Sequence, residues 1–167
     1  MPPHLGTPCI RTSRLVLTPL RLEDEAEHAR ASGSAADAAR DARTAAGHWA
    51  EHGFGLWAIR DRADGAFLGV AELHLAGEGI DGIRPDEIEA GWWVTEARRN
   101  AGIATEAMDA AIDDLWSRTD APGVAAYIDA GNPASERVAA KLGFVVRGPG
   151  RGRFGEPMTV HELRRHA

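Results

Sequence analysis

The chain of 167 residues contains one cysteine, Cys9, and no long apolar run. A single cysteine cannot form an internal disulfide, and it excludes a zinc site built on paired cysteines. No stretch approaches the roughly 18 consecutive apolar residues that a membrane-spanning helix needs. Residues 1–6 lack both the basic start and the apolar core of a signal peptide. We therefore expect a protein of the reducing cytoplasm with no membrane partner, and a flexible N-terminus over residues 1–9.

Metal and nucleotide signatures are also missing. His48 and His52 are four residues apart, but no third ligand is evident, so we expect no metal site. Neither the GxGxxG pattern of dinucleotide-binding proteins nor the P-loop pattern GxxxxGK(S/T) is present. These absences argue against a dinucleotide-binding or P-loop fold.

The formal net charge is −6, which disfavours nucleic acid as a partner because an acidic surface repels phosphates. The C-terminal part is basic, and we interpret its arginines as a solvated surface: Arg147, Arg151, Arg153, Arg164 and Arg165. With 44% apolar residues the chain can bury a core without a disulfide or metal. Its length fits a single domain over residues 1–167.

Hydrophobic periodicity and turn residues predict seven strands and four helices. Three successive strands joined by short turns exclude a pure βαβ repeat, whereas the two strands that flank the third helix can be parallel neighbours. We therefore predict an α/β (α+β) fold, with a mixed, mostly antiparallel sheet of six to seven strands and about four helices. The strands are expected at residues 14–20, 54–60, 66–75, 87–94, 124–129, 144–147 and 158–164, and the helices at 22–31, 34–52, 102–118 and 133–142, with loops at 77–85 and 148–156.

The junction between the strand at 87–94 and the helix that starts at about Gly102 predicts an anion site. The first turn of a helix leaves amide donors without partners, and the helix dipole favours an anion beside them. Gly102 and Ala104 are small enough to let a diphosphate approach the backbone, while Arg98 and Arg99 add positive charge. The pattern indicates a phosphate site but does not identify the phosphate.

Residues 99–104, RNAGIA, resemble the coenzyme A motif of the GNAT superfamily of N-acetyltransferases, Q/R-x-x-G-x-G/A. Residues 132–144, NPASERVAAKLGF, resemble the family signature NxxSxRVxxKLGF and make the more specific match. The element order fits a GNAT-like acyl-CoA N-acyltransferase fold over about residues 10–165, closest to the branch that contains ribosomal-protein N-terminal acetyltransferases. Two positions depart from the pattern: Asn100 replaces the first glycine of the loop, and Ala139 stands where many members have a tyrosine acid. Asparagine tolerates left-handed backbone, so the loop can keep its shape.

The resemblance implies acetyl-CoA as cosubstrate, held in a slot between splayed strands at 87–94 and 124–129. Backbone groups of one strand segment would bind the pantetheine arm, the loop and helix start would bind the pyrophosphate, and one asparagine would contact the cofactor near the thioester. These residues are Trp92, Trp93 and Val94; Arg99, Asn100, Ala101, Gly102, Ile103, Ala104 and Thr105; and Asn132. Since Trp92 and Trp93 are adjacent on a strand, they point to opposite faces of the sheet.

The same resemblance implies direct attack of an amine on the thioester, with a backbone amide of the strand at 87–94 stabilising the oxyanion. The amine must be neutral to attack, so a base is useful, and Glu89 is the first candidate, followed by Glu72 and Glu156. Ser135 is the candidate that protonates or hydrogen-bonds the leaving thiolate. Each of these residues also has an ordinary interpretation: Asn132 followed by Pro133 is a helix start, and Glu89 on a strand is more often solvated.

We therefore predict an enzyme that moves an acetyl group from acetyl-CoA to a primary amine, either a protein N-terminus or a small-molecule amine. The resemblance is also compatible with a homodimer. One alternative is a GNAT-like module that binds acyl-CoA without turnover, as a sensor or partner domain. Another is a phosphate-binding regulator unrelated to coenzyme A.

Overall fold

The computed structural model describes residues 8–166, which form one eight-stranded sheet and four α-helices. The flexible segment expected at residues 1–9 lies outside the described residues, except for Pro8 and Cys9, which precede the first strand. The strand count exceeds the predicted six to seven because a two-residue strand, too short for a periodic pattern, comes first. The strands are β1 (Ile10–Arg11), β2 (Leu15–Pro19), β3 (Trp57–Asp61), β4 (Phe67–Leu75), β5 (Ile88–Val94), β6 (Gly123–Asp129), β7 (Val145–Arg151) and β8 (Pro157–Arg164).

The strands follow the order β1-β2-β3-β4-β5-β6-β8-β7. All neighbours are antiparallel except β5 and β6, which confirms the predicted parallel pair. The helices are α1 (Glu25–Ser32), α2 (Ala35–His52), α3 (Ile103–Arg118) and α4 (Pro133–Leu142), and short 3-10 helices span Leu22–Asp24 and Glu96–Arg98. Among the described residues, no helix has the length and apolarity needed to cross a bilayer.

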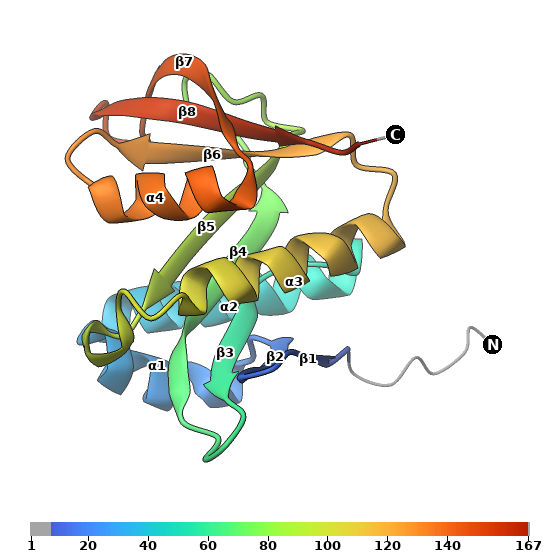
Figure 1. Cartoon of the computed structure of the whole chain (residues 1–167), viewed down its shortest axis with the longest axis vertical. Helices are drawn as coiled ribbons and strands as arrows, with labels where there is room; N and C mark the ends of the chain where they lie inside the picture. The colour runs from blue at the N-terminus through green and yellow to red at the C-terminus, as the bar shows by residue number, and fades with distance from the viewer. Residues whose placement is uncertain (1–7, 167) are drawn as a thin grey trace.

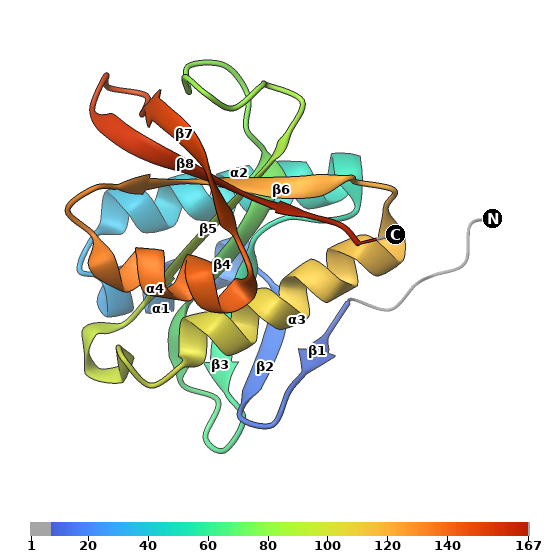
Figure 2. The same cartoon turned by 45° about the horizontal axis from the view of Figure 1, so that its top comes forward.

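The helices cover the two faces of the sheet, with α3 and α4 in front and α1 and α2 behind in Figure 2. The main core packs α3 against the sheet and includes Trp57, which is 1% exposed. A smaller core lies under α1 and α2. Trp92 and Trp93 separate as predicted, because Trp92 packs on the first core beside Phe144 and Trp93 lies on the second.

Local signals fixed the helix ends as expected. The Ser34 hydroxyl accepts a hydrogen bond from the Asp37 amide at 3.2 Å, and α2 ends at Gly53 with φ 72°. The Asn132 side-chain oxygen accepts from the Ser135 amide at 3.1 Å, with proline in the first turn of α4. The capping interpretation of Asn132 is thus confirmed.

The prediction of a loop over residues 148–156 is wrong for its first part. β7 continues through Arg151 and pairs with β8, so the connection is only residues 152–156. A register shift between Val146 and Gly148 interrupts the alternation from which a strand would be recognised. Pro149 is tolerated because β7 is the edge strand of the sheet.

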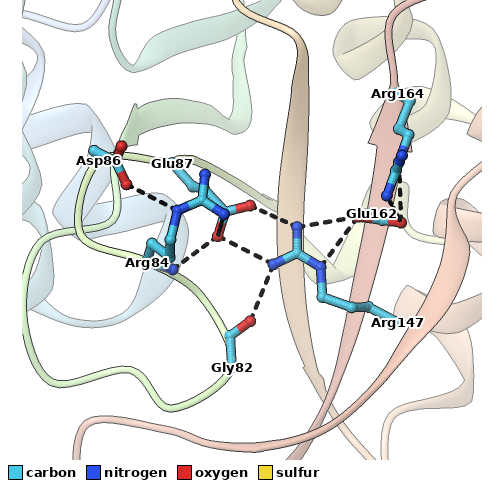
Figure 3. A network of polar contacts seen from close by, with 7 residues as sticks. All are labelled: Gly82, Arg84, Asp86, Glu87, Arg147, Glu162 and Arg164. Carbon is cyan, nitrogen blue, oxygen red and sulfur yellow. Dashed lines mark hydrogen bonds and ion pairs between the residues drawn. The ribbon is translucent and has the colours of Figure 1, made fainter.

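The C-terminal arginines lie on the exposed surface, as the sequence interpretation expected, and they also bond to neighbouring groups. Arg147 donates to both carboxylate oxygens of Glu87, at 2.6 and 3.1 Å, and to the Gly82 carbonyl at 3.0 Å (Figure 3). Glu162 accepts from Arg147 and from Arg164. These bonds fasten the loop before β5 to the β7–β8 hairpin. The remaining arginines of the set donate to carbonyls: Arg151 to Gly155, Arg153 to Ala76 and Glu78, and Arg165 to Thr119.

Candidate active site

β5 and β6 diverge after a single register pair, Glu89 with Ala125, although each strand has seven residues. Figure 1 shows β5 running diagonally away from β6 toward the start of α3. The divergence leaves the β6-facing backbone of the second half of β5 without a strand partner. This is the splay that the resemblance implied.

A cleft of about 570 Å³ opens at this splay, between the end of β5, the start of α3 and one face of α4. It brings together two segments that are about thirty residues apart in the sequence. Ten of the eleven residues predicted to hold the cofactor line it, and Ser135 lines it as well. The ten are Trp92, Trp93, Val94, Arg99, Asn100, Gly102, Ile103, Ala104, Thr105 and Asn132.

The loop before α3 has the backbone of an anion cradle. Asn100 has φ 60°, so asparagine adopts the left-handed conformation that its position demands. Gly102 has φ 77° and is the N-cap of α3. The first intrahelical bond runs from the Glu106 amide to the Gly102 carbonyl at 3.0 Å. The amides of Ile103 to Thr105 therefore face the cleft end of the helix without intrahelical acceptors.

The positive charge around the loop differs from the expectation. Arg98 hydrogen-bonds the Asp61 carboxylate, so its charge is neutralised, while Arg99 donates to the Val94 carbonyl at 3.3 Å. Two cations that the sequence analysis missed, Arg137 and Lys141, line the cleft from α4. They are four residues apart, which puts both on one helix face, and this spacing was the available signal. Lys141 is also the only lysine of the chain.

A second feature missed from the sequence fastens the loop to the start of the sheet. The Glu106 carboxylate accepts from the Ser13 hydroxyl at 3.1 Å, the Arg14 amide at 3.1 Å and Arg14 Nε at 2.7 Å, and also from Thr12. Arg14 Nη1 donates to the Ala101 carbonyl at 2.8 Å. Ala101, the one predicted cofactor residue outside the cleft lining, thus holds the loop through its carbonyl. Burial raises the pKa of Glu106, but these hydrogen bonds outweigh it and lower that pKa overall.

Glu89, the first candidate base, lies on β5 about 13 Å along the strand from Trp93, at 3.3 Å per residue. It is 7% exposed, which corrects the solvated interpretation. Arg153 Nη2 donates to Glu89 Oε2 at 3.3 Å, and His74 Nε2 lies 3.9 Å from Glu89 Oε1. Burial raises the pKa of Glu89, although His74 and Arg153 oppose this. A carboxylate with a raised pKa is suited to accept a proton.

The other two candidate bases differ in their availability. Glu72 lies opposite Gly91 in the β4–β5 register, and a Cβ at Gly91 would be 3.4 Å from its carboxylate. Glu72 therefore lies beside the strand that lines the cleft. Glu156 instead accepts from the Phe154 amide at 2.9 Å and so stabilises its own loop.

A larger hollow of about 850 Å³ lies at the opposite ends of β5 and β6. Its charged walls include the Arg147, Glu87 and Glu162 network of Figure 3, in which the charges already pair with one another. The unpaired amides at the start of α3 make the smaller cleft the better anion site.

A family model described as "Acetyltransferase (GNAT) domain" matches residues 14–145. The chain belongs to the GNAT acetyltransferase family. GNAT acetyltransferases use acetyl-CoA, so the predicted family and cosubstrate are both confirmed.

One curated protein and several solved structures are similar to this chain. YkkB of Bacillus subtilis, described as uncharacterized, is 32% identical over 117 residues, which cover 66% of this chain and 62% of YkkB. The match therefore spans less than two thirds of that relative. A GNAT-family acetyltransferase from Bordetella pertussis is similar in structure, with TM-score 0.79, 24% identity, and coverage of 93% of this chain and 98% of that chain. A structure described as a ribosomal-protein-serine acetyltransferase from Vibrio cholerae has TM-score 0.75 and 16% identity, and covers 96% of this chain and 100% of its own.

Two positions on α4 bear on the leaving group of a GNAT reaction. Ala139, where the family resemblance led us to look for a tyrosine, is fully buried in the main core, so this helix presents no phenol to the cleft there. Ser135 lies one turn earlier and lines the cleft. Of the two, Ser135 is the residue with a hydroxyl within the cleft wall.

Proposed function

We propose that this protein is an N-acetyltransferase that transfers the acetyl group of acetyl-CoA to a primary amine by direct attack. The acceptor is a protein N-terminus or a small-molecule amine. The pyrophosphate lies on the amides at the start of α3, and the pantetheine arm runs along Trp92 to Val94 into the splay.

In the reaction, the amine nitrogen attacks the thioester carbonyl carbon and the carbon–sulfur bond then breaks. Glu89 takes the proton that the amine loses, directly or through a water. The departing thiolate accepts a hydrogen bond from the Ser135 hydroxyl and takes up a proton from solvent, which balances the proton transferred to Glu89. A backbone amide of β5 stabilises the oxyanion that forms on the carbonyl oxygen.

The observation that carries the proposal is the placement of a buried carboxylate on the strand that lines the cofactor cleft. Glu89 and Trp93 project to the same face of β5, because they are four residues apart on one strand. An amine approaching from the α2 side thus meets a proton acceptor, while acetyl-CoA approaches from the α3 end. The cationic side chains Arg137 and Lys141 supply the charge that phosphate groups need.

The test is release of free thiol from acetyl-CoA with a panel of amines: peptides with N-terminal serine or alanine, free amino acids, polyamines and aminoglycosides. We expect turnover with at least one of these classes. Glu89→Gln should lower kcat by about 100-fold, which is typical of a lost general base, while the Kd for acetyl-CoA stays within about twofold.

Glu51→Gln is the matched control, because Glu51 lies on the outer surface of α2 with a side chain 77% exposed. It should behave as the wild type. Binding of acetyl-CoA without thiol release for any amine would overturn the proposed transfer in favour of a binding module.

A further inference from the structure

Glu72, His74 and Glu89 form a row on the α2-covered face of β4 and β5. His74 is the register partner of Glu89, and Glu72 is the partner of Gly91. Directly opposed residues of antiparallel strands project to the same face. His74 therefore lies between the two carboxylates that are the leading candidate bases.

The hydrogen bonds of His74 define which ring nitrogen faces the carboxylates. Its Nδ1 lies 2.9 Å from the Leu75 carbonyl oxygen, and because a carbonyl can only accept, Nδ1 donates. Nε2 lies 3.8 Å from Glu72 Oε2 and 3.9 Å from Glu89 Oε1. A neutral ring would present a lone pair to two carboxylates, whereas the imidazolium presents an N–H. The geometry therefore favours the charged ring.

The electrostatics of the two groups agree with this geometry. Burial of the ring opposes its charge, but the attraction of the Glu72 and Glu89 carboxylates, 3.8 and 3.9 Å from Nε2, outweighs it and raises the pKa of His74. In the other direction, burial raises the pKa of Glu89, and the positive charge of His74 is the foremost influence that lowers it. The two side chains thus stabilise each other's ionised form.

The remaining ionisable groups around the row do not replace His74. His48 on α2 is neutral, because its Nδ1 donates to the Phe54 carbonyl at 2.7 Å and its Nε2 accepts from the Leu75 amide at 3.1 Å. Arg153 contacts Glu89 but is 39% exposed, so solvent screens its charge. The ionisable groups that face the row are His28 from α1, Asp41 and His48 from α2, Tyr127 from β6, and Arg153 and Glu156 from the β7–β8 connection.

We propose that His74 is a positioning residue for acetyl transfer, whose imidazolium between Glu72 and Glu89 keeps Glu89 in the ionised form that accepts the amine proton. The inference rests on the proposed function, because it gives Glu89 the role of base. It makes the rate of acetyl transfer depend on His74, a residue outside the coenzyme A motif.

The first experiment compares the pH dependence of kcat/KM for wild type and His74→Gln, with acetyl-CoA and the fastest amine of the panel. Using one amine for both proteins cancels the titration of the acceptor. The variant should lose roughly tenfold at pH 6 and stay within about twofold at pH 9, because Glu89 without its cationic partner takes up its proton at higher pH than in the wild type. His74→Lys, which keeps the charge, should recover the activity at pH 6. His52→Gln on the α2 surface should keep the wild-type profile, and parallel profiles for wild type and His74→Gln would overturn the proposal.

The second experiment needs no acceptor. Long-range proton–nitrogen NMR spectra of ¹⁵N-histidine-labelled protein follow the His74 ring with pH, and His74→Gln assigns its signals. The midpoint should fall in both Glu72→Gln and Glu89→Gln, and a midpoint unchanged in both would refute the bridging role. Failure to acetylate any amine would instead refute the proposed function, so the two failures are distinguishable.

Discussion

Replacing Gly102 with glutamate should strongly weaken coenzyme A binding, because the new side chain places a negative charge in the proposed pyrophosphate site. Gly102 has φ 77°, a conformation that costs an L-residue about 1–2 kcal/mol. A Cβ there would lie 3.3 Å from Arg14 Nη2, so this guanidinium would need to shift by only a few tenths of an ångström. The fold should therefore tolerate the change, and the loss should fall on the ligand.

The size of the loss follows from Coulomb's law. A carboxylate about 5 Å from a phosphate charge, at an effective dielectric constant of about 20, costs about 3 kcal/mol. That corresponds to a Kd for coenzyme A that is about 100-fold higher. Since Gly102 is exposed, the effect should shrink at high salt. Gly102→Ala has the same backbone strain with and without ligand, so its Kd should stay within about threefold.

Calorimetric titration with coenzyme A and with S-acetylpantetheine, which has no phosphate, separates the repulsion between the glutamate and the phosphates from the other effects of the substitution. The glutamate and alanine variants should differ for coenzyme A and agree for S-acetylpantetheine, and thermal melts should show both folded. Equal affinities of the two variants for coenzyme A would refute the placement of the pyrophosphate on this loop.

Three other substitutions test separate features of the molecule. Glu106→Gln should lower the free energy of unfolding in urea by about 1–2 kcal/mol at pH 7. Hydrogen bonds outweigh burial and lower the pKa of Glu106 in the folded protein, so the difference in stability between the two proteins should shrink as pH falls toward and through that pKa. A difference that stays constant with pH would contradict the charged contact with Arg14. Burial raises the pKa of Asp41 to about 6, so ionisation of this carboxyl lowers the stability of the folded protein as pH rises above the ordinary carboxyl pKa. Asp41→Asn should therefore raise the free energy of unfolding by up to about 3 kcal/mol at pH 8 and leave it unchanged at pH 4. Ser135→Ala should lower kcat at least about tenfold with little change in the Kd for acetyl-CoA, whereas unchanged turnover would limit Ser135 to the first turn of α4.

The cleft at the end of β5 was predictable because its determinants are local. Residues 94–105 contain the end of a strand, two residues in left-handed conformation and the start of a helix. Each of these features is indicated by the residue types at its own position. Asn132 and Pro133 similarly define the start of α4 by capping. What the sequence required in addition was the resemblance, because local chemistry does not say that residues 99–104 and 132–144 share one cleft.

Contacts between distant residues were not predictable in this way. Arg98 looked like a free loop cation, and its partner Asp61 lies 37 residues earlier. Arg153 sits in a glycine-rich connection and reaches Glu89, 64 residues earlier. Such pairings depend on which strands become neighbours, and an arginine carries no local sign of its future partner. The extension of the edge strand β7 to Arg151 was not predicted for a related reason. Its glycines and proline are typical of a loop, and the strand is recognisable only from its pairing with β8.

The single lysine of the chain has a practical consequence for substrate identification. Of 19 lysine and arginine residues, only Lys141 carries an ε-amine, and guanidinium groups stay protonated and are poor nucleophiles. Lys141 lies in the wall of the cleft that we propose binds acetyl-CoA. A Lys141→Arg enzyme keeps the positive charge and has no side-chain amine of its own. Any acetyl-lysine detected after incubation of that variant with a protein mixture must then come from the mixture, which makes proteome-wide searches for an acceptor free of self-labelling at lysine.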